Sequence, residues 1–150
     1  MPDGLGQEFR GRIAKTGAQL GAITEEQSIG KIRDGGWTGK EILGHLLDSA
    51  ANNHIRFVRA VLEKRYEGPT YAQKESVDLH GYGAMSWKDL LEQWRVRNAL
   101  LTRVVSRIPE ESLDAPCRIA DHDAVTLRFL IVDYLDHMEQ HVVQIAGIQS

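Results

Sequence analysis

Helical periodicity in four long segments is the feature that most constrains how this chain folds. Apolar residues recur at steps of three and four over Leu5–Ile23, 38–63, 86–108 and Val125–Ile148. Strand signals are weak everywhere, because no alternating runs flank a hairpin turn. Four long amphipathic helices favour an all-α four-helix bundle. With 150 residues, the chain suits one domain built on one core, spanning residues 1–150.

Local signals mark the ends of the second and third helices. The run Thr38-Gly39-Lys40-Glu41 matches a capping box, and the helical pattern then continues to about Glu63 without a proline. Ser86 is a suitable N-cap for the third helix, and Pro109 marks its end. The helix boundaries are therefore predicted best in the middle of the chain.

A long connection separates the second and third helices. Lys64–Met85 contains several turn-forming glycines and is expected to include a short helix near Tyr71–Leu79. Its length allows the chain to cross the bundle, so that helices two and three run parallel. The topology would then be up-down-down-up, with helices two and four adjacent. The later segment Pro109–Ala124 is expected to be a loop.

Composition excludes several functional classes. The net charge is −3 with both signs interspersed, so nothing favours binding to nucleic acid or to a membrane surface. No stretch approaches the roughly 20 apolar residues of a membrane span, and the N-terminal run has no secretory signal, so we expect a cytoplasmic protein. The single cysteine, Cys117, is interpreted as a semi-buried structural thiol.

Two histidines on the fourth helix are the first candidate site. His137 and His141 are four residues apart, a spacing that brings side chains together on one helix face. Both fall within the apolar stripe, so they should point into the bundle. Two buried neutral imidazoles need partners, and one metal ion would serve both. From periodicity alone, a metal site and a pair of hydrogen-bonded core histidines are about equally favoured.

A third ligand would have to come from another helix, and His45 is the candidate. It shares a polar stripe with Ser49, Asn52 and Arg56, which is either a solvated surface or a polar cleft beside the metal. The apolar arc of the same helix, over Glu41–Glu63, is unusually wide and indicates contact with a second copy of the chain. The remaining histidines are interpreted as solvated or structural: His54, His80 and His122.

Two runs resemble a known family. The segment 44–57, GHLLDSAANNHIRF, followed far downstream by 133–141, DYLDHMEQH, is similar to the DinB-like (YfiT-like) superfamily of metal-binding bundles. Trp37, Trp94 and Asn98 extend the resemblance over nearly the whole chain. The resemblance implies an up-down-down-up bundle, often dimeric, with a three-histidine metal site at the positions of His45, His137 and His141.

The resemblance leaves the activity open. Members include thiol-dependent transferases, a thiol-dependent isomerase and proteins of unknown role, and no motif here selects a thiol. Three neutral imidazoles would leave a divalent ion with open positions, which is the catalytic rather than the structural zinc pattern. Nickel, iron or manganese would accept the same ligands. Such an ion lowers the pKa of bound water to about 7 or binds a thiol as thiolate.

Two hypotheses follow for the function. The first is a metal-dependent enzyme acting on a small molecule, either an S-transferase using a low-molecular-weight thiol or a hydrolase. The second is a non-catalytic metal-binding dimer in stress response or regulation, in which a fourth protein ligand would block the ion. The candidate substrate-cleft residues are Ser49, Asn52, Arg56 and Asn98. Asn98 is equally well explained as a core amide that fixes helix register.

Overall fold

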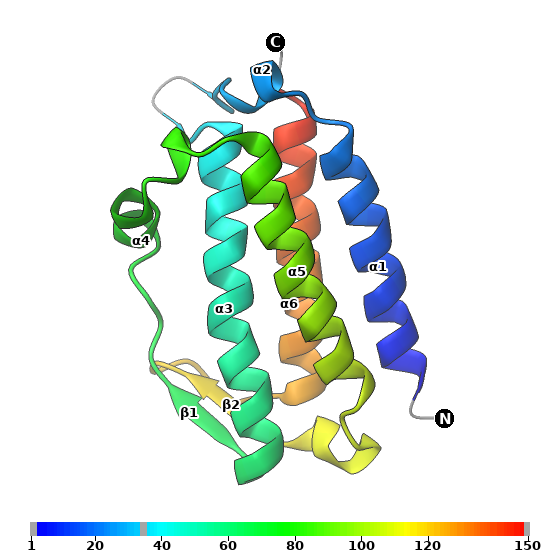
Figure 1. The fold of residues 1–150 in the computed structure, drawn as a ribbon. Coiled ribbons are helices and arrows are strands. Elements are labelled where there is room, and N and C mark those ends of the chain that lie inside the picture. The colour runs from blue at the N-terminus through cyan, green and yellow to red at the C-terminus, as the bar shows by residue number, and fades with distance from the viewer. Residues whose placement is uncertain (1–2, 34–35, 149–150) are drawn as a thin grey trace.

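The chain folds into a bundle of four long helices (Figure 1). The computed structural model describes residues 3–33 and 36–148. The long helices are α1 (Asp3–Gly21), α3 (Gly39–Glu63), α5 (Trp87–Ser106) and α6 (Leu127–Ala146). The shorter elements are α2 (Glu25–Ser28), α4 (Gln73–His80), the 3-10 turns η1 (Tyr82–Ala84) and η2 (Glu110–Asp114), and the strands β1 (Tyr66–Gly68), β2 (Pro116–Ile119) and β3 (Val125–Thr126).

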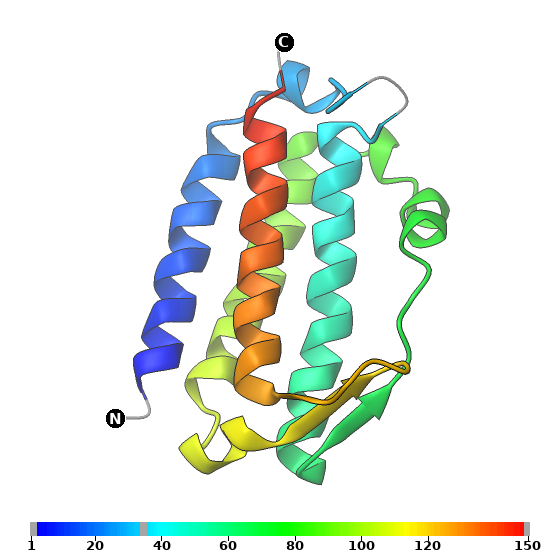
Figure 2. The ribbon, with the colours of Figure 1, turned by 180° about the vertical axis from the view of Figure 1, so that it is seen from behind.

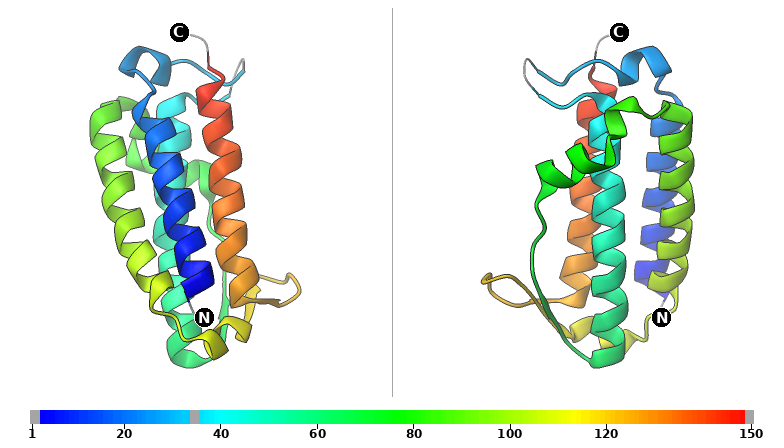
Figure 3. Two further views of the ribbon diagram at one scale, coloured as in Figure 1. Left: turned by 90° about the vertical axis from the view of Figure 1, so that its right-hand side faces the viewer. Right: turned by 60° about the vertical axis from the view of Figure 1, so that its left-hand side comes forward.

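The predicted up-down-down-up topology is confirmed. Figures 1 and 2 show α1 and α6 running in one direction and α3 and α5 in the other. Around the bundle, α3 packs against both α5 and α6, and α1 packs against the same two helices on the opposite side. The expected adjacency of the second and fourth long helices is therefore confirmed. The connection between α3 and α5 climbs alongside α3 and carries α4, close to the predicted short helix (Figure 3).

Side-chain caps explain where three helices begin. The Thr38 hydroxyl accepts from the Glu41 amide at 3.2 Å, and the Glu41 carboxylate accepts from the Thr38 amide at 3.0 Å. This is the predicted capping box, which satisfies backbone donors that the first turn leaves free. Ser86 caps α5 as expected, and Thr126 caps α6 by accepting from the Phe129 amide.

Although strand signals are weak everywhere in the sequence, the structure contains one small three-stranded sheet. Its order is β1-β2-β3, with β1 parallel to β2 and β2 antiparallel to β3. Strands this short cannot display an alternating pattern, and their pairing is long-range, with Tyr66 opposite Cys117. Part of the expected loop 109–124 is therefore ordered as η2 and β2. Val125 belongs to β3, so the last helix begins at Leu127 rather than at Val125.

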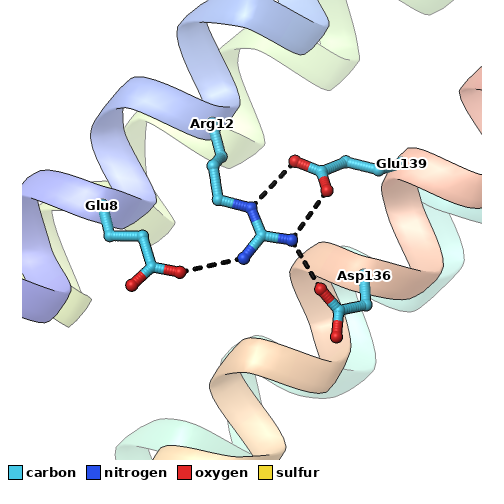
Figure 4. Close-up of polar contacts among 4 residues, drawn as sticks. All are labelled: Glu8, Arg12, Asp136 and Glu139. Carbon is cyan, nitrogen blue, oxygen red and sulfur yellow. Dashed lines mark hydrogen bonds and ion pairs between the residues drawn. The ribbon is translucent and has the colours of Figure 1, made fainter.

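An arginine network ties α1 to α6 (Figure 4). The Arg12 guanidinium donates to both carboxylate oxygens of Glu139, at 2.7 and 2.8 Å, and to Asp136 at 2.6 Å. It also donates to Glu8 one turn earlier on its own helix, at 2.9 Å. These carboxylates raise the pKa of Arg12, with Glu139 contributing most. The network joins the two helices outside a continuous apolar core that includes Phe9, Phe57, Trp94 and Leu135.

The outer surface of α3 remains partly apolar. Ile55 and Leu62 are 57% and 75% exposed. The rest of the wide apolar arc is largely used within the bundle and against α4, so the homodimer stays a prediction. Within the described residues, no helix combines the length and the apolar character that crossing a membrane requires.

Candidate metal centre

Three imidazoles meet between α3 and α6. His45 lies in the second turn of α3, and His137 and His141 are one turn apart on α6. The Nε2 atom of His137 lies 3.4 Å from that of His45 and 3.2 Å from that of His141. One ring nitrogen from each residue lies within 4.8 Å of the other two. The structure therefore brings together the three residues that the sequence singled out.

His45 is buried, with 1% of its surface exposed. Of the two interpretations left open for its stripe, the solvated surface does not apply at this position. The Trp37 ring, just before the capping box, tilts against the imidazole with centroids 5.2 Å apart. Because the capping box fixes where α3 begins, it also fixes the position of His45 relative to α6.

One hydrogen bond outside the cluster orients the ring of His141. His141 Nδ1 lies 2.8 Å from the Gln144 side-chain oxygen, which can only accept. Nδ1 must therefore carry the proton, and the lone pair of Nε2 points into the cluster. Such an outer hydrogen bond is typical of histidines that bind metals. The Nδ1 atom of His45 is buried and has no partner among the described residues.

Burial keeps two of these histidines neutral. The pKa of His45 is lowered to about 4, chiefly by removal from solvent and also by the neighbouring His141 and His137, while Asp48 opposes the shift. Burial also lowers the pKa of His137, against the opposing effect of Asp133. Neutral imidazole is the form that binds a metal ion. Three nitrogen lone pairs that converge in this way can bind a divalent cation. When neither a proton nor a cation lies between them, the lone pairs repel one another.

Sequence reasoning missed a polar network one turn beyond His45. The buried carboxylate of Asp48 accepts hydrogen bonds from the Tyr82 hydroxyl and the Ser76 hydroxyl, each at 2.7 Å. His80 Nδ1 lies 3.6 Å from the same carboxylate, and its ring stacks on Tyr82 with centroids 4.7 Å apart. The network fastens α4 and η1 onto α3 beside the cluster. The only signal in the sequence was the position of Asp48, three residues after His45.

Two cavities border the histidines. The first has a volume of about 340 Å³ and includes His137 in its wall. The second has a volume of about 540 Å³ and includes His141, Gln144 and Trp37. One cavity therefore lies against the cluster at His137 and the other at His141. Among the described residues, no fourth His, Cys, Asp or Glu side chain joins the three histidines.

The predicted cleft residues separate into two groups. Ser49 and Arg56 line the first cavity. Asn52 instead donates to the Asp48 carbonyl, at 2.9 Å. Asn98 is fully buried, where it donates to the Trp94 carbonyl and accepts from the Tyr134 hydroxyl.

Several cavity residues were not predicted to take part in a site. The first cavity is also lined by Tyr71, Cys117, His122, Asp123 and Asp133. Burial raises the pKa of Tyr71 to about 12, so its hydroxyl stays protonated at neutral pH. These residues come from separate segments that the small sheet and the crossover bring together, and no local pattern signals their meeting.

Comparison with known proteins shows which family the chain resembles in sequence and fold. Residues 8–145 match the family model of the DinB superfamily. "Putative metal-dependent hydrolase OB0782" of Oceanobacillus iheyensis is 35% identical over 60 residues, which are 40% of this chain and 35% of that protein. "Putative metal-dependent hydrolase YfiT" of Bacillus subtilis is 30% identical over 77 residues, which are 51% of this chain and 37% of that protein. These alignments thus span little more than a third of either relative.

Solved structures share the fold. The structure of YfiT from Bacillus subtilis, described as an unusual four-helix bundle, superposes with a TM-score of 0.81 at 21% identity, covering 93% of this chain and 83% of that one. A mycothiol-dependent maleylpyruvate isomerase superposes with a TM-score of 0.79 at 13% identity, covering all of this chain and 62% of that one. Since the family model spans most of the sequence, the chain belongs to the DinB superfamily.

Proposed function

We propose that this protein is a metal-dependent enzyme that acts on a small molecule, with His45, His137 and His141 as ligands to one divalent ion. The observation that carries the proposal is the convergence of three Nε2 atoms beside two cavities. Zinc, nickel and iron suit three imidazoles, and manganese would accept them less readily because it prefers oxygen ligands. The relatives named as metal-dependent hydrolases support the metal requirement.

The geometry favours catalysis over a structural role. A structural zinc site fills four positions with protein ligands, whereas only three candidate ligands meet among the described residues. When bound, the ion would lower the pKa of a water molecule or thiol that coordinates to it. Asp133 lines the same cavity as His137, and it is our candidate to accept the proton that is released. Tyr71 remains a neutral hydroxyl donor in the same cavity.

Two reactions suit such a centre: hydrolysis, and transfer of a low-molecular-weight thiol to an electrophile. Access from two cavities favours the transferase, because a thiol and an electrophile could approach the ion from different sides. The fold shared with a mycothiol-dependent isomerase supports the use of a thiol cosubstrate. The alternative is a non-catalytic metal-binding homodimer.

We further propose that the chain acts as a homodimer in the cytoplasm.

An activity screen on metal-loaded protein tests this proposal. The full chain is chelated, reloaded separately with each of the four metals, and assayed with ester and amide substrates and with electrophiles plus several thiols. We expect turnover that depends on metal and disappears in His141→Ala. Thiol consumption matching product would identify the transferase, and turnover without thiol would identify the hydrolase. Metal binding at full stoichiometry with no turnover in any assay would favour the non-catalytic alternative.

A further inference from the structure

A buried arginine without a carboxylate partner lies in the wall of the first cavity. Arg56, in the third quarter of α3, is 9% exposed. The single acceptor that its guanidinium contacts among the described side chains and backbone is the Pro69 carbonyl, at 3.2 Å. No carboxylate in that part of the chain comes within 4.0 Å of it. A buried charge that is not paired is costly, so this cation is suited to an anion from outside the chain.

The surroundings favour an anion at this position. Arg56 shares the cavity with hydroxyl and amide donors from Tyr71, Ser49 and Gln73. The guanidinium has five N–H donors in a planar fork, which matches the two oxygens of a carboxylate. Since one carbonyl occupies one donor, the remaining donors are available.

The acidic residues of the cavity do not neutralise this arginine. Asp123 and Asp133 also line it, but neither forms an ion pair with Arg56. Asp133 lies one helical turn before His137 on α6 and lines the cavity together with it. The cavity therefore has an acidic group near the histidines and a basic group elsewhere.

The spacing along α3 separates the two functions of the cavity. Arg56 follows His45 by three helical turns, roughly 16 Å along the axis. Arg56 thus lies too far along the helix to take part in chemistry at the histidines. It is placed to hold a remote end of a molecule whose reacting end is at the metal.

We propose that Arg56 forms an anion subsite that binds a carboxylate of the substrate or of the thiol cosubstrate. This inference rests on the proposed function, because it assigns part of the same cavity to substrate recognition. Arg56 would be a positioning and specificity residue rather than a catalytic one. The reacting molecules would accordingly be small organic acids or carboxylate-bearing thiols, rather than neutral esters or amides.

Equilibrium binding tests the subsite separately from the metal. Isothermal titration of the chelated full chain would compare glutarate with glutaramide, which has the same skeleton without charge. We expect glutarate to bind at least tenfold more tightly, and Arg56→Met to remove about that factor, as expected for a hydrogen-bonded charge pair. Arg56→Lys should recover part of the affinity. Arg59→Met is the matched control, because Arg59 is exposed on the same helix and pairs with Glu63.

A second arm identifies the source of the carboxylate. With the metal-loaded chain, glutathione would be compared with 2-mercaptoethanol, which lacks a carboxylate. If Arg56→Met weakens glutathione alone, the subsite holds the thiol cosubstrate; if it weakens glutarate, the subsite holds the electrophile or hydrolysed substrate. Equal affinity of the wild-type chain for the charged and neutral ligands of both pairs would overturn the proposal, even if Arg56→Met failed to fold. If the chain bound glutarate but failed to take up any metal ion on reloading, the proposed metal-dependent function would be refuted, and the anion subsite would stand.

Discussion

Replacement of Gly44 by alanine tests how closely the crossover packs onto the helix that carries His45. Gly44 is in the interior of α3, where alanine is normally favoured by about 1 kcal/mol. Here an added Cβ would meet the Tyr82 side chain, 2.6 Å from its Cβ and closer still to two ring carbons. Tyr82 cannot easily retreat, because its hydroxyl is bonded to Asp48 and its ring is stacked on His80.

The steric cost should exceed the gain in helix propensity. Overpacking of a filled core typically costs about 1–3 kcal/mol, and displacing Tyr82 also weakens its bond to the buried carboxylate by about 1.5–3 kcal/mol. After subtraction of the propensity gain, we expect Gly44→Ala to destabilise the chain by about 1.5–5 kcal/mol. For a domain of this size, that lowers Tm by about 3–20 °C.

Thermal and urea denaturation of the chelated chain would measure this effect. Gly11→Ala is the matched control, because Gly11 lies inside α1 with nothing within 4 Å of an added Cβ, and it should be neutral or stabilising. Combining Gly44→Ala with Tyr82→Ala should cost less than the sum of the two single variants, since the clash is then removed. A Gly44→Ala chain as stable as wild type would refute the packing of η1 on α3.

Three further predictions concern stability, pH and assembly. Arg12→Ala should lower the free energy of unfolding by about 1 kcal/mol, because its partly exposed network joins α1 to α6; an unchanged melting curve would count against that contribution. The chelated chain should lose stability as the pH falls from about 6.5 towards 4. In this range the His45 imidazole becomes protonated in the unfolded chain but stays neutral in the folded one, which lowers the free energy of unfolding by on the order of 3 kcal/mol. His45→Gln should flatten that part of the profile, and an unaltered profile would assign the effect elsewhere. Sedimentation at micromolar concentration should show a dimer that Ile55→Lys with Leu62→Lys converts to monomer; a wild-type monomer would exclude the dimer.

Periodicity and capping signals predicted the fold because they are local. Apolar residues at helical spacing and the Thr38 capping box place the long helices within a few residues. The length of the crossover then allowed the parallel arrangement of α3 and α5. The sheet was missed because strands of two to four residues are defined by their partners and not by their own sequence.

The histidine cluster was only partly predictable from pattern. His137 and His141 follow from their four-residue spacing on an apolar face, which is a local property. His45 could not be assigned in the same way, because a polar stripe on a helix looks the same whether it faces solvent or a cleft. The family resemblance supplied that residue. The Asp48–Tyr82 contact depends on how the crossover folds back onto α3, and so does the anion subsite. Contacts between residues this far apart in the sequence leave no local pattern.

Elemental analysis of untagged protein tests the central claim most directly. The wild-type chain and a His54→Ala control, altered on the same helix as His45 but outside the cluster, should each contain one divalent ion per chain. His141→Ala should contain almost none, because two imidazoles rarely hold an ion against water and buffer, while its circular dichroism spectrum should remain that of the helical bundle. A folded His141→Ala chain that retained one ion per chain would contradict the three-histidine metal centre.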